Sequence, residues 1–356
     1  MLICLSSGDR PRYRQDILRA LALPIESDLQ FRYDKRWVTD GVLQMIQDHT
    51  IVGQEILIAY ADQSRPSDGS ITTGAIKLVP IRLATVVFAA APGRTVSLIF
   101  SLGKVTYASD LDAFNNEVAN LTGRNLPRWV NGNPHGFYCT ELNSRPSNFV
   151  EIQDLGHWED VVNQISAHRD FECEETFFTV IGLLTEDELK AMGAELHHLP
   201  WIRELPANVC RELVIYHYHP TKSPANLEIS ISAGPELKLQ SLDKSRLDSR
   251  YDLKKFRVQS EDPLFRIQRS WISLIARDPM VDERLELEMS ICVRGARWKR
   301  LGIAAVIALG LTGAQIIPLV TRGDLTPAIK VVSALTILVL SFVVGLAAVW
   351  GIRRAI

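Results

Sequence analysis

Two long apolar runs near the C-terminal end constrain this 356-residue chain more than any other feature of its sequence. Residues 301–320 carry no charged side chain, and residues 328–352 carry only Lys330. An α-helix rises about 1.5 Å per residue, so twenty residues span about 30 Å, the thickness of a bilayer's hydrocarbon core. The sequence therefore predicts transmembrane helices at 301–320 and 328–352, joined by a short non-cytoplasmic turn at 321–327. A buried helical hairpin is the alternative.

Basic residues flank both apolar runs. A basic juxtamembrane segment at 296–300 precedes the first run, and two arginines follow the second. Because cytoplasmic flanks are rich in Lys and Arg, this pattern predicts a multi-pass protein of the cell (inner) membrane with both termini in the cytoplasm. Basic side chains at such positions attract anionic lipid headgroups. The residues expected to contact lipid are Arg294, Arg297, Lys299, Arg300, Arg353 and Arg354.

Small and polar residues recur at four-residue spacing within the two runs. Small residues let membrane helices approach closely, and Thr or Gln can form hydrogen bonds between helices. The residues expected to pack membrane helices are Ala304, Ala308, Thr312, Gln315, Ser341 and Gly345. Two interpretations remain open, because the hairpins could cluster into a pore or the two helices could simply pack on each other.

The remaining sequence predicts an α+β soluble body. Residues 1–147 mix helical and strand patterns and are expected to form a mixed α/β domain for ligand or partner recognition. Residues 148–295 are expected to form a mixed and then β-rich domain. Its last part, 210–294, contains six runs with strand character, such as the alternating residues 285–290, and predicts an all-β, sandwich-like subdomain.

Charge and cysteine content exclude some classes of protein. Removing the four basic residues and one acidic residue of 301–356 leaves 35 basic and 40 acidic residues in 1–300, which disfavours a globally basic nucleic-acid binder. The odd number of cysteines, five, and their wide spacing without a CxxC motif predict reduced thiols.

Motifs for catalysis or metal binding are not evident. The sequence lacks GxGxxG, GxxxxGK[ST], GxSxG and HExxH. His217 and His219 would share one strand face, but no cysteine or carboxylate lies at a spacing that would complete a zinc site. We therefore expect no enzymatic activity, no metal and no cofactor.

Cationic and aromatic residues gather near the N-terminus. Guanidinium groups bind phosphate through forked hydrogen bonds, and aromatic faces stack on bases. These runs predict a pocket for a nucleotide, a cyclic oligonucleotide or a nucleic-acid end; the alternative is a set of solvated charges around a core Trp. The candidate ligand-binding residues are Arg10, Arg12, Arg32, Lys35, Arg36, Trp37 and Arg82.

The predicted layout is a large recognition body followed by a minimal membrane module. By layout alone it is similar to membrane effectors of bacterial antiviral defence, an analogy that transfers no residue. We expect a sensor–effector whose body binds a ligand or partner and whose hairpins cluster to disrupt or depolarise the membrane. A tethered scaffold or adaptor, and a membrane-associated enzyme with an unrecognised site, are the alternatives. Expected partners are the lipid bilayer, a protein partner or homo-oligomer, and a nucleotide or nucleic-acid ligand.

Overall fold

The computed structural model is built mostly from β-strands. It describes residues 1–8, 10–63, 73–171, 176–192, 197–220, 227–240, 244–247, 249–263, 267–277, 284–295, 302, 305–306 and 326–351. Strands account for 47% of the structure and helices for 27%. The predicted α+β fold class is therefore wrong, because the β-branched runs extend into longer, curled strands than the sequence pattern indicated.

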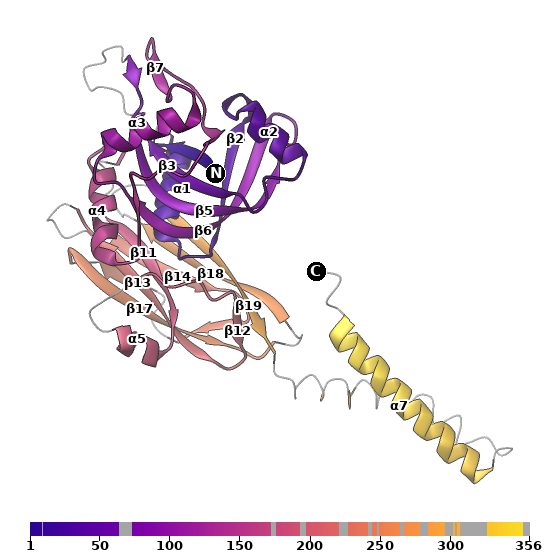
Figure 1. The fold of residues 1–356 in the computed structure, drawn as a ribbon. Coiled ribbons are helices and arrows are strands. Elements are labelled where there is room, and N and C mark those ends of the chain that lie inside the picture. Colours follow the sequence, from indigo (N-terminus) through magenta and orange to yellow (C-terminus); the bar gives the residue numbers. More distant parts are fainter. Residues whose placement is uncertain are drawn as a thin grey trace.

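A mixed sheet forms the first part of the chain (Figure 1). Its strand order is β10-β6-β5-β3-β1-β9, with β2 also paired to β6, and β1 and β3 run parallel. The strands are β1 (Leu2–Ser7), β2 (Asp28–Asp34), β3 (Glu55–Ala61), β5 (Leu78–Ala90), β6 (Thr95–Tyr107), β9 (Cys139–Glu141) and β10 (Val150–Ile152). A smaller sheet contains β4 (Gly74–Ala75), β7 (Arg128–Val130) and β8 (Asn133–His135).

Both faces of this sheet are covered at β1 and β3, which explains why these two strands are apolar along most of their length. Alternate residues of β1 and β3 enter two separate hydrophobic clusters: Cys4 and Ile58 lie in one, Ile3 and Leu57 in the other. The helices of this part are α1 (Pro11–Ala22), the 3-10 helix η1 (Lys35–Trp37), α2 (Asp40–Gln47) and α3 (Leu111–Thr122). Apolar residues of α1 enter the first cluster, and Phe114 of α3 enters the second.

Two β-sheets form the second part. Their strand orders are β11-β13-β17-β15 and β12-β19-β18-β14-β16. The elements are α4 (Leu155–Ser166), η2 (Arg169–Phe171), β11 (Phe177–Leu184), α5 (Glu186–Met192), β12 (Glu204–Pro206), β13 (Cys210–Tyr218), β14 (Leu227–Ala233), β15 (Leu237–Leu239), β16 (Lys244–Leu247), β17 (Tyr251–Ser260), β18 (Ile267–Arg277) and β19 (Arg284–Arg294). The six strand runs read from 210–294 overlap β13, β14, β15, β17, β18 and β19.

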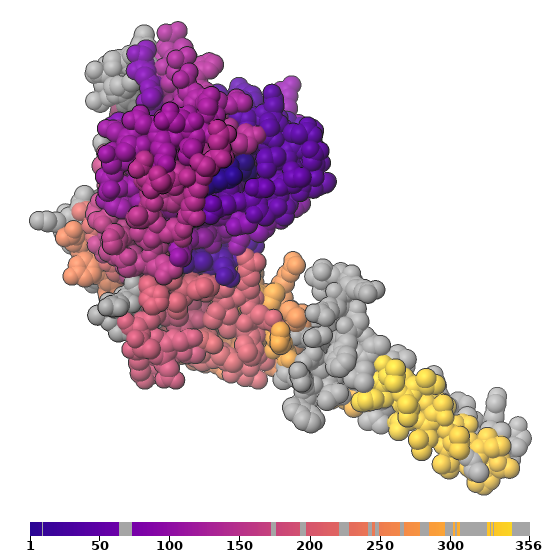
Figure 2. All heavy atoms as spheres, in the orientation of Figure 1, coloured from indigo at the N-terminus to yellow at the C-terminus, as the bar shows by residue number. Residues whose placement is uncertain are grey.

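Helix α1 joins the two parts. It packs against β1 and β5 of the first sheet and against β11 and β19 of the second part. The first hydrophobic cluster consequently runs without a break from Ile17 of α1 to Val214 of β13. Figure 2 shows the two parts as one continuous body, with α7 (Pro327–Gly351) extending away from it.

The carboxyl end of α1 is held by Arg82 of β5. The last carbonyl groups of a helix have no partner within the helix and carry a partial negative charge. The fully buried Arg82 guanidinium donates hydrogen bonds to the carbonyl oxygens of Ala20 (2.8 Å) and Leu23, and to Gly103 O at 2.8 Å. Burial lowers the pKa of Arg82 to about 9, because the charged form has lost its water.

The predicted transmembrane hairpin is wrong. A hairpin requires two continuous helices that can each cross the bilayer, and within the described part of the chain no helix is both long enough and apolar enough to do so. The multi-pass inner-membrane location that depended on this hairpin, with its segments 301–320, 321–327 and 328–352, is wrong for the same reason.

Few of the residues assigned to that hairpin lie in the described part of the chain. Ser341 lies buried on α7, Gly345 belongs to the same helix, and Arg294 ends β19 with its side chain bonded to Glu204. The other helix-packing and headgroup residues lie outside the described residues, namely Ala304, Ala308, Thr312, Gln315, Arg297, Lys299, Arg300, Arg353 and Arg354.

We expect Arg82→Met to lower the free energy of unfolding by about 2–4 kcal/mol, because it removes the donor to three carbonyl groups, of which those of the buried residues Ala20 and Leu23 end α1. Urea unfolding followed by circular dichroism measures the change. Arg269→Met is the matched control, since Arg269 is exposed on β18, and its effect should stay within about 0.5 kcal/mol. Equal effects of the two variants would contradict the role given to Arg82.

Candidate functional site

A cavity of about 230 Å³ lies beside the carboxyl ends of β1 and β3 and the start of α1. Its walls include Ser6 and Ser7 of β1 and Gln63, two residues after β3. In sheets with parallel strands, ligands bind in the crevice outside the carboxyl ends of those strands. The position of this cavity is therefore that of a ligand site.

The start of α1 gives the cavity a positive backbone wall. Pro11 occupies the first turn, and among the described residues no side chain caps the helix at Arg10; the Tyr13 and Arg14 N–H groups donate to Arg10 O. The preceding strand is fixed against the helix, since Ser6 Oγ donates to Tyr13 O at 3.1 Å. Helix N-termini attract negative charge.

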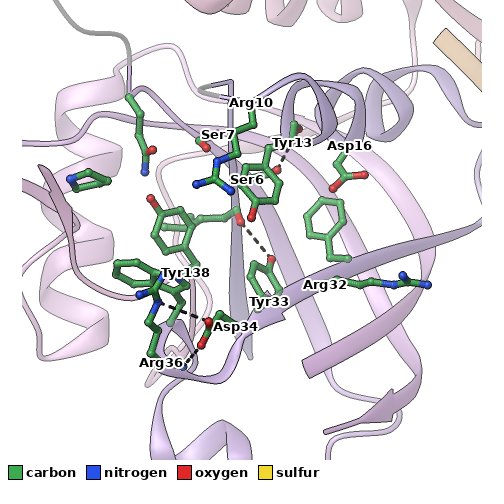
Figure 3. Close-up of a pocket in the computed structure, with 15 residues that line it drawn as sticks. Ser6, Ser7, Arg10, Tyr13, Asp16, Arg32, Tyr33, Asp34, Arg36 and Tyr138 are labelled. Atoms are coloured by element: carbon green, nitrogen blue, oxygen red, sulfur yellow. Dashed lines mark hydrogen bonds and ion pairs between the residues drawn. The ribbon is translucent and has the colours of Figure 1, made fainter. Parts of the chain in front are cut away.

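Three arginines line the cavity, and they differ in how they lie. Figure 3 shows Arg10 reaching over the cavity from the start of α1, Arg36 approaching from the side of Asp34, and Arg32 pointing away from both. The Arg10 guanidinium lies 5.9 Å from the Tyr13 ring centre. The Arg36 guanidinium lies 4.8 Å from the Trp37 ring centre, and its Nε is 3.7 Å from Asp34 Oδ2.

Aromatic rings form the rest of the wall. Trp37 and Tyr138 meet edge to face with 5.3 Å between ring centres, and both remain partly exposed. The ring of Tyr33 is buried, and its hydroxyl donates to Leu5 O at 3.2 Å, which fixes it against β1. Partly exposed Trp and Tyr faces beside guanidinium groups suit a planar, negatively charged ligand.

Two buried polar side chains also face the cavity. Gln63 is 3% exposed, and its Nε2 has no hydrogen-bond partner among the residues that the structure describes. A buried amide without a partner is costly, and a ligand oxygen would satisfy it. Burial raises the pKa of Asp16 to about 6, against the opposing effect of Arg19, whose Nη1 lies 3.9 Å from Asp16 Oδ1.

A neighbouring polar cluster holds the loop between β1 and α1 in place. Tyr60 donates to Asp170 Oδ2 at 2.7 Å, and His168 Nδ1 lies 2.9 Å from Asp62 Oδ2. Gly8 packs so closely on Asp170 that an added Cβ would lie 2.3 Å from its Cβ. Within the described ranges, no three His, Cys, Asp or Glu side chains are arranged to hold a metal ion.

The structure brings four of the seven sequence-predicted residues to this cavity: Arg10, Arg32, Arg36 and Trp37. Arg12 and Lys35 do not line it; Arg12 is exposed on α1, and Lys35 belongs to η1. Arg82 lies at the opposite end of α1, where it binds carbonyl groups. The spacing of residues in the sequence does not distinguish a basic side chain that faces solvent from one that binds the carbonyl groups at the end of a helix.

Several wall residues were not predicted from the sequence. They are Ser6, Ser7, Tyr13, Asp16, Tyr33, Asp34, Gln63 and Tyr138, among others. The pairing of β1 with β3 brings Gln63 beside Ser7, and the pairing of β1 with β9 brings Tyr138 beside Leu5. One local signal was present, because a short apolar strand followed by Ser-Ser-Gly and a helix marks the carboxyl end of a strand in an α/β unit.

Comparison with known proteins gives no family. No family description matches the sequence, and no curated protein matches it. Solved structures match parts of the chain. The CsuC–CsuE chaperone–tip adhesion subunit complex of Acinetobacter baumannii is similar with a TM-score of 0.21 and 9% identity, over 26% of this chain and 53% of that chain.

Two further solved structures show the same level of similarity. The YadV chaperone has a TM-score of 0.21 and 8% identity over 34% of this chain and 52% of that chain. Trypsin-activated alpha-2-macroglobulin from Escherichia coli has a TM-score of 0.25 and 9% identity over 78% of this chain and 17% of that chain. The chain thus spans about half the length of the first two structures. At these scores the similarities carry no inference about function.

Proposed function

We propose that the chain is a ligand-recognition protein whose cavity at the start of α1 binds a nucleotide-like anion. The observation that carries this proposal is the meeting of unlike groups in one small space: the guanidinium groups of Arg10 and Arg36, the rings of Trp37 and Tyr138, and the Gln63 amide, whose Nε2 has no partner among the described residues. A planar ring joined to a phosphate satisfies all of them at once.

The phosphate is assigned to the side of Arg10. Its guanidinium lines the cavity beside the start of α1, and both a guanidinium group and the positive end of a helix dipole favour negative charge. Arg36 is already paired with Asp34, so its contribution is weaker and its main contact is with the Trp37 ring.

The base is assigned to the side of Trp37. Stacking on a half-exposed indole or phenol ring accepts any base, whereas the Gln63 amide can donate a hydrogen bond to a base carbonyl. The proposal concerns recognition. The membrane-disrupting step expected from the sequence depended on the hairpin and is not part of it.

Arg10→Ala should weaken binding of a nucleoside monophosphate about tenfold, because it removes one charge-assisted contact. Isothermal titration calorimetry of the full chain with adenosine, guanosine, cytidine and uridine monophosphates measures the change. Arg12→Ala is the matched control, since Arg12 is exposed on the same helix but does not line the cavity. If all four nucleotides fail to saturate the chain at millimolar concentration, or if both variants bind equally, the proposed function is wrong.

Binding should also weaken as the pH rises through about 6. Below this pH the Asp16 carboxyl is neutral, and above it the carboxylate adds a negative charge to the cavity wall. For 3′,5′-cyclic adenosine monophosphate, whose charge does not change in this range, we expect affinity roughly three- to tenfold lower at pH 7.5 than at pH 5.

Asp16→Asn isolates this effect. The variant should bind with the affinity of the neutral form at both pH values, because an amide has no titrating proton. A pH dependence that persists in Asp16→Asn would show that another group causes it.

A further inference from the structure

Three cavities of the N-terminal part are neighbours, and each shares wall residues with the next. The cavity at the start of α1 shares Arg36 and Trp37 with a second, of about 380 Å³, which also touches Arg124. The second shares Asn125 and Gly136 with a third, of about 310 Å³. Because each cavity shares wall residues with the next, the three lie in a row from the start of α1 past Trp37 to the β7–β8 hairpin, and we call this row the groove.

Positive charge continues along this groove. Its walls contain five arginines (Arg10, Arg32, Arg36, Arg124 and Arg128) and three aspartates (Asp16, Asp34 and Asp40). Arg124 and Arg128 are exposed, and neither has a carboxylate partner within the part of the chain that the structure describes. The far end of the groove is therefore open to an additional anionic group.

The local backbone structure sets the positions of Arg124 and Arg128 in the chain. Helix α3 ends at Gly123, whose φ of 59° is the left-handed conformation typical of a helix stop, and Arg124 follows directly. Arg128 begins β7, which turns back into β8 through Asn131 and Gly132, both with positive φ. A Cβ atom added to Gly136 would lie only 2.8 Å from Pro127 Cα, so only glycine fits there.

We infer that the groove takes a short single-stranded oligonucleotide, with one nucleotide in the cavity at the start of α1 and the following phosphates beside Arg124 and Arg128. This inference rests on the proposed function and adds the class of ligand. Spaced cations along a groove with a stacking ring between them are how proteins hold single strands without reading their sequence. The groove crosses two cavities beyond the first, so a mononucleotide would leave the distant arginines without a partner.

The test is a length series. Fluorescence anisotropy of the full chain with labelled oligothymidylates of one, two, four and six nucleotides should show affinity rising at least tenfold from one to four nucleotides. Arg124→Glu with Arg128→Glu should remove this gain and leave binding of the mononucleotide unchanged. It should also reduce the slope of log affinity against log salt by about 1.4, the value for two phosphate contacts on a single strand.

Arg269→Glu with Arg277→Glu is the matched control. Both residues are exposed on β18, outside the groove, and the double change alters net charge by the same amount. A loss of affinity equal to that of the groove variant would show that only overall charge matters, and would overturn the inference.

The remaining outcomes separate this inference from the proposed function. Mononucleotide binding without any gain with length overturns the oligonucleotide and leaves the nucleotide cavity standing. Oligonucleotide binding without mononucleotide binding supports the groove and overturns the assignment of the cavity. A phosphorylated peptide that displaces the six-nucleotide probe at equal concentration would show that the groove binds polyanionic peptides and not nucleic acid.

Discussion

The hydrogen bonds between Arg82 and the carboxyl end of α1 are the interaction on which the rest of this fold depends. They place a buried cation where the helix leaves its carbonyl groups unpaired. Trp158 adds a second donor, because its Nε1 lies 3.3 Å from Leu21 O. With its end fixed in this way, α1 can pack on the first sheet with one side and on β11 and β19 with the other. One helix therefore determines both the shared core and the wall of the cavity at its start.

Two side chains of α1 connect the cavity to the second part of the chain. Asp16 faces the cavity and lies 3.9 Å from Arg19, and Arg19 Nε donates to Glu286 O of β19 at 3.1 Å. The Asp16 carboxyl in the cavity is thus connected to β19 through two contacts, one from Asp16 to Arg19 and one from Arg19 to Glu286. The large shared cluster makes relative movement of the two parts costly, since separating them would expose apolar side chains on both sides.

The sequence allowed the strands and part of the site to be predicted, for identifiable physical reasons. The apolar run at residues 2–5 predicts a strand by its local pattern and lies within β1, and the cation–aromatic run around Arg36 and Trp37 is also local, so both could be found by inspection. Tyr138 and Gln63 reach the cavity only through strand pairing, which local pattern does not encode. Arg82 does not reach the cavity, because its guanidinium binds the carbonyl groups at the end of α1, a contact that local sequence pattern does not encode. The prediction of a transmembrane hairpin was wrong because hydropathy measures how apolar a segment is and not whether it forms a membrane-spanning helix.

The positive charge of the groove comes from the local arrangement of its side chains and not from the net charge of the chain. The first 300 residues carry five more acidic than basic residues, yet the groove walls carry two more arginines than aspartates. Asp34 is already paired with Arg36, so this aspartate opposes a bound anion less than its charge alone suggests, and Asp16 opposes it only above about pH 6. An acidic protein can therefore present a positive groove.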